Sequence, residues 1–275
     1  MPRNLNDMVV IITGASAGIG RALAVELSAR GAKLSLAARR LDRLEELRGK
    51  LAGDPLIVAT DVSKEEDCRR LIDRTIEKFG RIDTLVCNAG YGFLSPVAQT
   101  TREQLQQIFA TNVLGTTDCI YFATPHMLKQ ELRDGWRGQV MMVSSVVARR
   151  GLPFFGAYSA TKAAQLSLGE AMRVELQPQK IAVTTVHPAG TDTEFGDVSA
   201  NLSAGKRPRR VSGEPRQSAQ VVAQKMVRAI QRPKPEVWPF RPARWFFTLG
   251  AMTPGLVDRV LNKRRDLIGG ASAQA

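Results

Sequence analysis

Short β-branched runs alternate with longer amphipathic segments through the first 190 residues of the chain. The runs have the length of buried strands, and the segments between them repeat apolar residues every three or four positions, which is typical of helices. Strict alternation predicts a parallel sheet with right-handed crossovers and helices on both faces. The expected strands are Val9–Thr13, Lys33–Ala38, Leu56–Thr60, Thr84–Cys87, Gln139–Val143, Ile181–Val186 and Glu236–Trp238, and the expected helices span 18–30, 40–51, 65–79, 101–130, 157–177 and 218–231.

The length of the chain suits one domain with an appended tail. A chain of 275 residues can bury one substantial α/β core, and 44% hydrophobic with 24% charged residues is ordinary for a globular protein. We expect a single domain over 1–235, which includes a long mobile loop at 191–217 rich in Gly, Ser, Pro and Arg. A basic amphipathic extension is expected at 236–275.

The cysteines and histidines exclude several classes of site. Cys68, Cys87 and Cys119 show no CxxC pairing, so we expect reduced thiols and a cytoplasmic protein. His126 and His187 lie far apart, so no metal site is expected. The N-terminus lacks the pattern of a secretory signal, and no apolar run reaches the ~20 residues of a spanning helix.

The first expected strand runs directly into a glycine-rich turn, and a helix follows. Gly14, Gly18 and Gly20 permit a tight turn, close approach to a pyrophosphate and close packing of helix on strand. The helix N-terminus then offers free N–H groups to phosphates. Glycine alone is weak support because turns need it anyway, but the strand–turn–helix context favours a dinucleotide site. The turn reads Thr13-Gly14-Ala15-Ser16-Ala17-Gly18-Ile19-Gly20.

The second expected strand ends in two arginines. An NAD site would place an acid here for the ribose 2′-OH, whereas an arginine accommodates the 2′-phosphate of NADP(H). Asp42 lies in the following helix, so Arg39 is the predicted 2′-phosphate ligand, with Ser16 or Arg40 as helpers. The alternative is a pair of solvated arginines at a helix start.

Two further strand ends carry candidate residues. Asp61 and Val62 follow the third strand, and Asn88 and Gly90 follow the fourth. Ligands of open α/β sheets bind at the carboxyl ends of strands. From the residues alone, Asp61 could instead cap the helix that begins near Lys64, and Gly90 could serve the turn.

A tyrosine and a lysine lie four residues apart on one helix face. In Tyr158-Ser159-Ala160-Thr161-Lys162 a nearby cation would lower the tyrosine pKa of ~10 and make the phenol an acid or base. Such a spacing is usually structural, but Ser145 stands 13 residues upstream at a strand end, where its hydroxyl could stabilise a substrate oxygen. Asn112 lies within the long expected helix, with an ordinary exposed polar residue as the alternative.

These motifs together resemble the classical short-chain dehydrogenases/reductases. TGASAGIG, Asp61-Val62, CNAG, Asn112, the Ser144-Ser145 pair and YSATK follow in the family's order over about residues 8–190. The resemblance implies a Rossmann-type, doubly wound parallel sheet of about seven strands with helices on both faces. It also implies a tetrad, with tyrosine as the acid/base, serine positioning the carbonyl, lysine on the nicotinamide ribose and asparagine supporting a water relay. The implied tetrad is Asn112, Ser145, Tyr158 and Lys162.

The same resemblance implies further cofactor contacts. Asp61 would contact adenine, and Asn88 and Gly90 would line the cofactor. The chain departs from the family's pattern at CNAG and after the sixth strand, where His187-Pro188-Ala189-Gly190 stands. Pro188 and Thr193 are expected beside the nicotinamide, and His187 is interpreted as a strand-end residue. The full predicted cofactor set is Gly14, Ser16, Gly18, Ile19, Gly20, Arg39, Asp61, Val62, Asn88, Gly90, Tyr158, Lys162, Pro188 and Thr193.

The tail carries most of the positive charge. From Asn201 onward 15 Lys and Arg stand against 4 Asp and Glu, which gives +11 of the total +13. Three interpretations compete: a helix that closes the substrate pocket or a subunit interface, an anionic membrane surface met by aromatic and basic residues, and, least favoured, nucleic acid. No nucleic-acid motif accompanies the charge, so no nucleic-acid partner is expected.

The predicted function is NADP(H)-dependent interconversion of a carbonyl and an alcohol on a hydrophobic substrate. A non-catalytic NADP(H)-binding sensor or scaffold on the same fold is the alternative, since fold does not fix function. Such a protein would be expected to lose part of the tetrad. An epimerase or dehydratase would usually need a longer substrate domain than the residues after Gly190 allow. The family resemblance also implies a homodimer or homotetramer built on helices 101–130 and 157–177.

Overall fold

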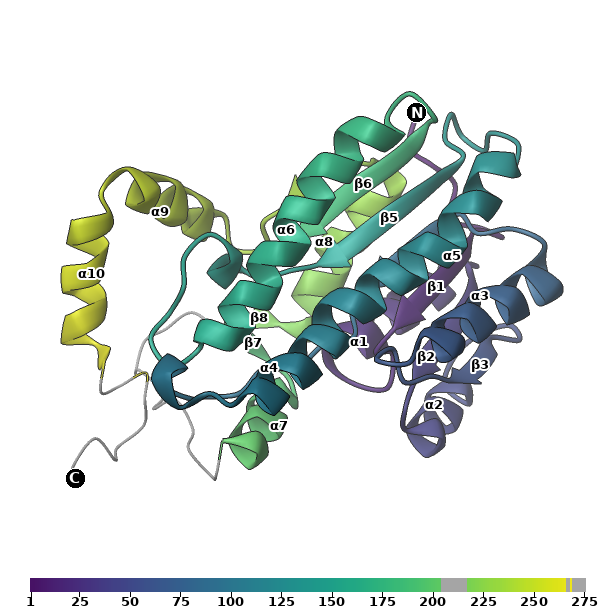
Figure 1. Ribbon diagram of the computed structural model, residues 1–275. Coiled ribbons are helices and arrows are strands. Elements are labelled where there is room, and N and C mark those ends of the chain that lie inside the picture. The colour runs from purple at the N-terminus through teal and green to yellow at the C-terminus, as the bar shows by residue number, and fades with distance from the viewer. Residues whose placement is uncertain (204–216, 266–267, 269–275) are drawn as a thin grey trace.

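A computed structural model describes residues 1–203, 217–265 and 268 of the chain (Figure 1). Its main sheet has seven parallel strands in the order β3-β2-β1-β4-β5-β6-β9. The order reverses between β1 and β4, and ligands of such sheets bind at this switch point. The predicted Rossmann-type fold is therefore confirmed. The strands are β1 Val9–Thr13, β2 Lys33–Ala38, β3 Leu56–Ala59, β4 Thr84–Cys87, β5 Gly138–Val143, β6 Ile181–Val186 and β9 Glu236–Val237.

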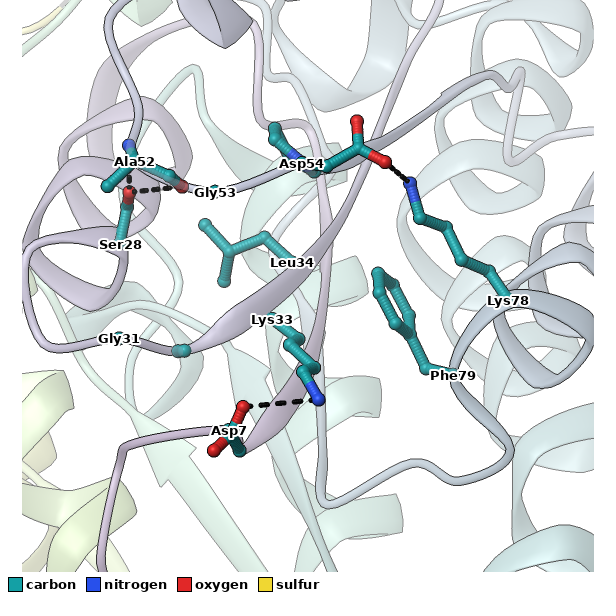
Figure 2. A pocket seen from close by; sticks show the side chains of 12 residues that line it. Asp7, Ser28, Gly31, Lys33, Leu34, Ala52, Gly53, Asp54, Lys78 and Phe79 are labelled. Carbon is teal, nitrogen blue, oxygen red and sulfur yellow. Dashed lines mark hydrogen bonds and ion pairs between the residues drawn. The ribbon is translucent and has the colours of Figure 1, made fainter.

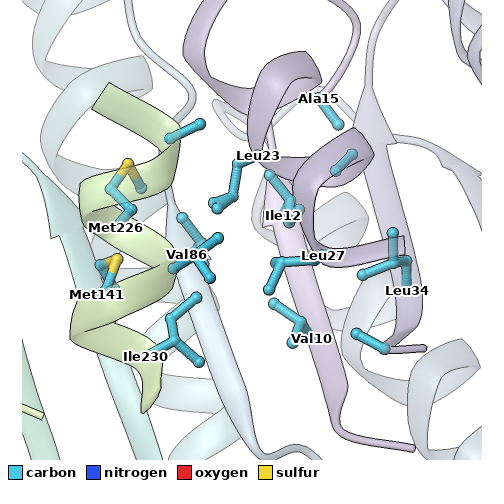
Figure 3. Close-up of a cluster of buried hydrophobic side chains, with 14 of the residues drawn as sticks. Val10, Ile12, Ala15, Leu23, Leu27, Leu34, Val86, Met141, Met226 and Ile230 are labelled. Atoms are coloured by element: carbon cyan, nitrogen blue, oxygen red, sulfur yellow. The ribbon is translucent and has the colours of Figure 1, made fainter. Parts of the chain in front are cut away.

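Helices cover both faces of this sheet and bury two apolar clusters. One cluster joins the sheet to α1 (Gly18–Ser28), α2 (Leu41–Arg48) and α8 (Ala219–Gln231), with α1 packed along α8 (Figure 3). The other joins the opposite face to α3 (Glu65–Phe79), α5 (Gly115–Lys129) and α6 (Gly156–Leu176). Strands buried on both faces explain the nearly continuous apolar runs of the sequence.

The expected helix over 101–130 is interrupted. Helix α4 (Arg102–Phe109) is followed by a π-helical turn at Ala110–Leu114 before α5 begins. Such turns occur where a wide helical ring serves a functional site. Pro125 lies inside α5.

The segment at 191–217 is not a loop throughout, so that prediction is wrong in part. It contains β7 (Thr191–Asp192), α7 (Phe195–Leu202) and the first residue of β8 (Gln217–Ser218), which pairs with β7 in a second small sheet. Gly, Asp and Ser within α7 gave this stretch the composition of a loop. Residues 204–216 of the expected loop lie outside the described part of the chain.

The N-terminal arm is fixed by a buried arginine. Arg3 is 1% exposed, and its guanidinium donates to the side-chain oxygen of Gln139 at 3.1 Å and to the carbonyls of Asp83 and Ile230 at 3.0 and 3.4 Å. Burial lowers the pKa of Arg3 to about 10. This one side chain therefore joins the starts of β4 and β5 to the end of α8.

Beyond β9 the chain forms two helices, α9 (Arg241–Met252) and α10 (Pro254–Lys263). They pack on each other and project from the side of the α/β domain (Figure 1). Ala243 is buried, and Gly250 and Val257 are buried where the two helices meet, whereas Trp245 is 68% exposed. The strand β9 at the start of the expected extension forms the edge of the main sheet.

Candidate functional site

The glycine-rich turn between β1 and α1 is tightly built. Gly14 and Gly18 have φ angles of 67° and 55°, which favour glycine. A Cβ atom on Gly20 would lie 2.5 Å from the carbonyl oxygen of Gly14, so the close approach of α1 to the turn requires glycine. The Asn88 amide donates to the carbonyls of Thr13 and Gly14 at 2.9 and 3.2 Å and holds the turn from β4.

The start of α1 suits an anion. Within the described residues, no side chain caps the helix at Ala17 and its first turn holds no acid. The first N–H groups therefore keep their donor capacity for a phosphate. Gly18 faces Thr193, because a Cβ atom built there would lie 3.1 Å from the Thr193 side chain. Ile19 is half-buried and packs partly against the core.

The arginines after β2 occupy different places. Arg39 is exposed at the strand end, as a ligand for a 2′-phosphate would be. Arg40 instead donates to the Ser16 hydroxyl at 3.2 Å and to the Glu194 carboxylate at 2.9 Å. Arg43 from α2 pairs with the same carboxylate.

Asp61, at the end of the third strand, does not cap helix α3. The Asp61 carboxylate accepts hydrogen bonds from the N–H and hydroxyl of Ser63, at 3.1 and 2.7 Å. Lys64 occupies the N-cap of α3, so Asp61 shapes the turn before the helix. Val62 is buried.

Tyr158, Ser145 and Lys162 meet at the end of β5. Ser145 follows the strand, and Tyr158 and Lys162 come from adjacent turns of α6. The Ser145 side chain is near enough to the phenol to favour its ionised form. The Lys162 ammonium lies 5.6 Å from the centroid of the Tyr158 ring and donates at 2.9 Å to the Val143 carbonyl. The sequence motifs are therefore brought together in one buried cluster.

Burial dominates the protonation of this cluster. It raises the pKa of Tyr158 to about 12, although the nearby Ser145 side chain opposes the rise. It lowers the pKa of Lys162 to about 7. The expected fall of the Tyr158 pKa is therefore wrong for the protein by itself, because desolvation outweighs the nearby cation.

Asn112 is buried and not an ordinary exposed residue. Its amide accepts from the Tyr91 N–H at 3.0 Å and donates to the Tyr91 carbonyl at 2.9 Å and to Thr161 Oγ1 at 3.0 Å. Its backbone carbonyl, within the π-helical turn, accepts from Gln165 Nε2 at 2.6 Å and from Thr116 Oγ1 at 2.9 Å.

Gln165 is a residue of the cluster that the motifs did not indicate. It is fully buried on α6, and its Oε1 accepts from Lys162 Nζ at 2.9 Å while its Nε2 reaches Asn112. Gln165 therefore links the lysine to the asparagine. Its position three residues after Lys162 on the same helix face was the available signal.

The segment after β4 connects the two halves of the site. A Cβ atom on Gly14 would lie 2.9 Å from Ala89 Cα, and one on Gly90 would lie 3.0 Å from Asn112 Oδ1 and 3.5 Å from Lys162 Nζ. The predicted Asn88–Gly90 motif thus touches the glycine-rich turn on one side and the Asn112–Lys162 pair on the other. Gly90 is needed for this close approach and not just for a turn.

The end of β6 closes the cluster from the other side. The Pro188 carbonyl accepts from the Val146 N–H at 3.1 Å. His187 is buried and stacks on Trp238 with centroids 4.4 Å apart, and burial lowers its pKa to about 4. His187 therefore packs as a strand-end residue, as expected.

Aromatic side chains surround the phenol. The ring of Phe195, on α7, lies 5.2 Å from that of Tyr158, and the ring of Phe155 lies 6.2 Å away. A Cβ atom on Gly92 would contact both Phe195 and Tyr158. The next two residues, Phe93 and Leu94, are buried. These groups make the surroundings of the phenol apolar.

A separate hollow lies at the amino end of β2 (Figure 2). Its charged groups are paired with each other, Lys33 with Asp7 at 3.1 Å and Lys78 with Asp54 at 2.5 Å. It lies opposite the strand ends where ligands bind in this fold. The described residues contain no group of three His, Cys, Asp or Glu suited to a metal ion.

The strand order and the turn at its switch point define a Rossmann-type nucleotide-binding protein. The family model for short chain dehydrogenases matches residues 8–201, so the chain belongs to that family. It is 35% identical to 11-beta-hydroxysteroid dehydrogenase-like 2 of Arabidopsis thaliana over 94% of this chain and 82% of that one. It is 32% identical to the uncharacterized oxidoreductase YxnA of Bacillus subtilis over 95% and 73%.

Solved structures agree with this membership. A short chain dehydrogenase/reductase from Burkholderia phymatum in complex with NAD has a TM-score of 0.81 at 24% identity, covering 92% of this chain and 96% of that one. An alcohol dehydrogenase from Thermococcus sibiricus complexed with 5-hydroxy-NADP has a TM-score of 0.71 at 26% identity, covering 84% and 95%. The chain is therefore an oxidoreductase of a family whose members bind NAD or NADP.

The buried Lys162 predicts a pH dependence of stability. Its pKa in the folded chain is about 7, below the usual 10.5, so between these values the unfolded chain binds one proton more and stability rises with pH. The slope approaches about 1.4 kcal/mol per pH unit. We expect the free energy of unfolding of the wild type, minus that of Lys162→Met, to rise by about 2 kcal/mol from pH 7 to 9 in urea titrations.

The control for this measurement is Lys33→Met, which removes a half-exposed lysine. Its difference from the wild type reports what a changed net charge contributes to the slope. Equal slopes for the two variants would contradict a depressed Lys162 pKa.

Proposed function

We propose that the protein is an NADP(H)-dependent oxidoreductase that interconverts a carbonyl and an alcohol on a hydrophobic substrate. The observation that carries the proposal is the contact of one segment, Asn88–Gly90, with both the glycine-rich turn and the Asn112–Lys162 pair. This segment would line a cofactor held at the turn along its path toward Lys162 and Tyr158. Nicotinamide supplies the hydride when it is bound.

Each residue of the cluster has a separate role in the proposed reaction. Tyr158 keeps its proton near neutral pH because its pKa is about 12, so it can donate that proton to the oxygen of a carbonyl as it is reduced. Ser145, close to the phenol, positions the same oxygen. Lys162 is held by Val143 and Gln165 where it can reach a ribose hydroxyl and the phenol. Asn112 fixes this lysine through Gln165.

The cofactor-facing residues fit a dinucleotide with an extra phosphate. The uncapped start of α1 suits the pyrophosphate, and Arg39 and Arg40 after β2 suit a 2′-phosphate. Asp61, Val62, Pro188 and Thr193 stand at neighbouring strand ends, where the family resemblance places adenine and nicotinamide contacts. Together these positions support NADP(H) over NAD.

The substrate class follows from the apolar surroundings of Tyr158. Phe195 and Phe155 flank the phenol, so a hydrophobic carbonyl compound or alcohol fits better than a charged one. The names of relatives, a hydroxysteroid dehydrogenase-like protein and an alcohol dehydrogenase, support the same class. A non-catalytic sensor is the weaker candidate because all four tetrad positions are occupied and assembled.

We also propose a cytoplasmic homodimer or homotetramer. Tyr121 on α5 and Val174 on α6 are 71% and 72% exposed, on the two helices that the family resemblance assigns to subunit contacts. The buried free thiols of Cys68, Cys87 and Cys119 suit a reducing compartment. Light scattering should give a multiple of the 30.1 kDa chain mass, and a monomer at micromolar concentration would contradict this proposal.

Helices α9 and α10 support attachment to an anionic membrane surface. Trp245, Phe246, Leu249 and Met252 are 53–78% exposed on α9, beside the exposed Arg241 and other basic residues. Apolar side chains with neighbouring arginines suit the interface of an anionic bilayer. None of the described helices is long and apolar enough to cross a membrane, so the contact we propose is peripheral.

The cofactor proposal predicts a nucleotide preference that depends on arginine. In fluorescence titrations the wild type should bind NADPH more tightly than NADH, and Arg39→Ala should weaken NADPH binding by about tenfold or more, with little effect on NADH. Arg48→Ala on α2 is the matched control. Tyr158→Phe should still bind NADPH but reduce a panel of hydrophobic ketones at least ~100-fold more slowly. Binding of neither nucleotide would overturn the proposal.

The membrane proposal predicts lipid-dependent binding. The wild type should sediment with vesicles that contain phosphatidylserine and stay in solution with phosphatidylcholine alone. The double variant Trp245→Ala/Leu249→Ala should lose about tenfold or more of this binding, because each side chain contributes apolar area. Leu41→Ala/Leu132→Ala, which alters exposed leucines elsewhere, is the control. Equal binding of both double variants would sink the proposal.

A further inference from the structure

An internal carboxylate occupies the arginine cluster beside the glycine-rich turn. Glu194 accepts from Arg40 Nη1 at 2.9 Å and pairs through its other oxygen with Arg43. The hydrogen bonds from these two arginines lower the pKa of Glu194. Arg40 also donates to Ser16 of the turn, so all four side chains form one group.

The cluster has the chemistry of a phosphate site. Guanidinium groups bind carboxylates and phosphates through the same forked pattern of donors. They come from the end of β2 and the start of α2, where an adenosine ribose is expected in this fold. A 2′-phosphate at Arg40 and Ser16 would meet the carboxylate of Glu194 there.

The ion pairs of Glu194 with Arg40 and Arg43 are weak enough to break. The side chains of Arg40, Arg43 and Glu194 are 38–43% exposed, and ion pairs with that exposure contribute little to stability. A phosphate ester carries more charge than a carboxylate and three acceptor oxygens. A phosphate ester can therefore displace the Glu194 carboxylate from the two arginines.

We infer that Glu194 is a specificity-determining residue that competes with the 2′-phosphate of the cofactor for Arg40 and Arg43. The inference rests on the proposed function and adds a residue that works against the preferred cofactor. The competition concerns the phosphorylated nucleotide alone, because a free 2′-hydroxyl needs no arginine. Glu194 lowers the apparent affinity by the fraction of molecules in which it holds the arginines.

The competing residue is also joined to the substrate side. Phe195 follows Glu194 directly and begins α7, with its ring 5.2 Å from that of Tyr158. When the 2′-phosphate displaces Glu194, the start of α7 loses its ion pairs to α2 and to Arg40. The 2′-phosphate site and the substrate side are therefore linked through two adjacent residues, Glu194 and Phe195.

The test compares nucleotides with and without the phosphate on Glu194→Gln. NADPH and 2′,5′-ADP should bind about three- to tenfold more tightly to the variant than to the wild type, whereas NADH and 5′-AMP should change less than about twofold. Glu46→Gln is the matched control, since Glu46 also holds two cations, Arg21 and Lys50, on the outer side of α2. It removes the same charge without touching Arg40.

Each contrary outcome has a distinct meaning. Unchanged or weaker NADPH and 2′,5′-ADP binding in Glu194→Gln would overturn the inference while leaving the enzyme proposal intact. Equal tightening of NADH, or the same gain in Glu46→Gln, would reduce the effect to net charge and also overturn it. Failure of the wild type to bind any of the four nucleotides would overturn the proposed function together with the inference.

Discussion

The hydrogen bonds between Thr13 and the end of β4 organise the rest of the site. Thr13 Oγ1 accepts from the backbone N–H groups of Asn88 and Ala89 at 3.0 and 3.1 Å. The side-chain amide of Asn88 donates to the carbonyl of Thr13. These bonds cross the point where the strand order reverses. The turn that suits a phosphate and the segment that reaches Asn112 are therefore parts of one rigid connection, and their spacing is fixed by the sheet.

A second constraint is the cost of burying ionisable groups. Tyr158 and Lys162 lie in a cluster that disfavours both phenolate and ammonium, so each needs hydrogen-bond partners. For Lys162 these partners are the Val143 carbonyl and Gln165, which in turn donates to the Asn112 carbonyl. Asn112 lies in the π-helical turn, so this interruption of the helix belongs to the same hydrogen-bonded group.

The sequence predicts the sheet and its helices well because their signal is local. The strands β1, β2, β4 and β6 begin and end where the apolar runs do, and the other expected strands agree within one residue at either end. Ser145, Tyr158 and Lys162 lie near one another because a strand end and a four-residue helical spacing bring them together, and both signals are local. The α7 helix was missed because its polar and glycine residues resemble those of a loop.

Other features of the site depend on distant parts of the chain. The Tyr158 pKa is set by burial, which no motif reports. Asn112 is buried within a π-helical turn, which interrupts a helix whose apolar spacing looks continuous. The pairing of Glu194 with Arg40 joins residues 154 positions apart, and neither stands in a pattern that indicates the other.

The hydrogen bonds of the buried Arg3 side chain affect the order in which the chain can fold. Its guanidinium contacts lie on β4, β5 and the last turn of α8, up to 227 residues away in the sequence. During synthesis Arg3 leaves the ribosome well before Ile230, so its set of acceptors is complete only when α8 has been made. The N-terminal arm must therefore wait, and such long-range closure slows folding. The arm that carries Arg3 is therefore fixed only after the last turn of α8 has been made.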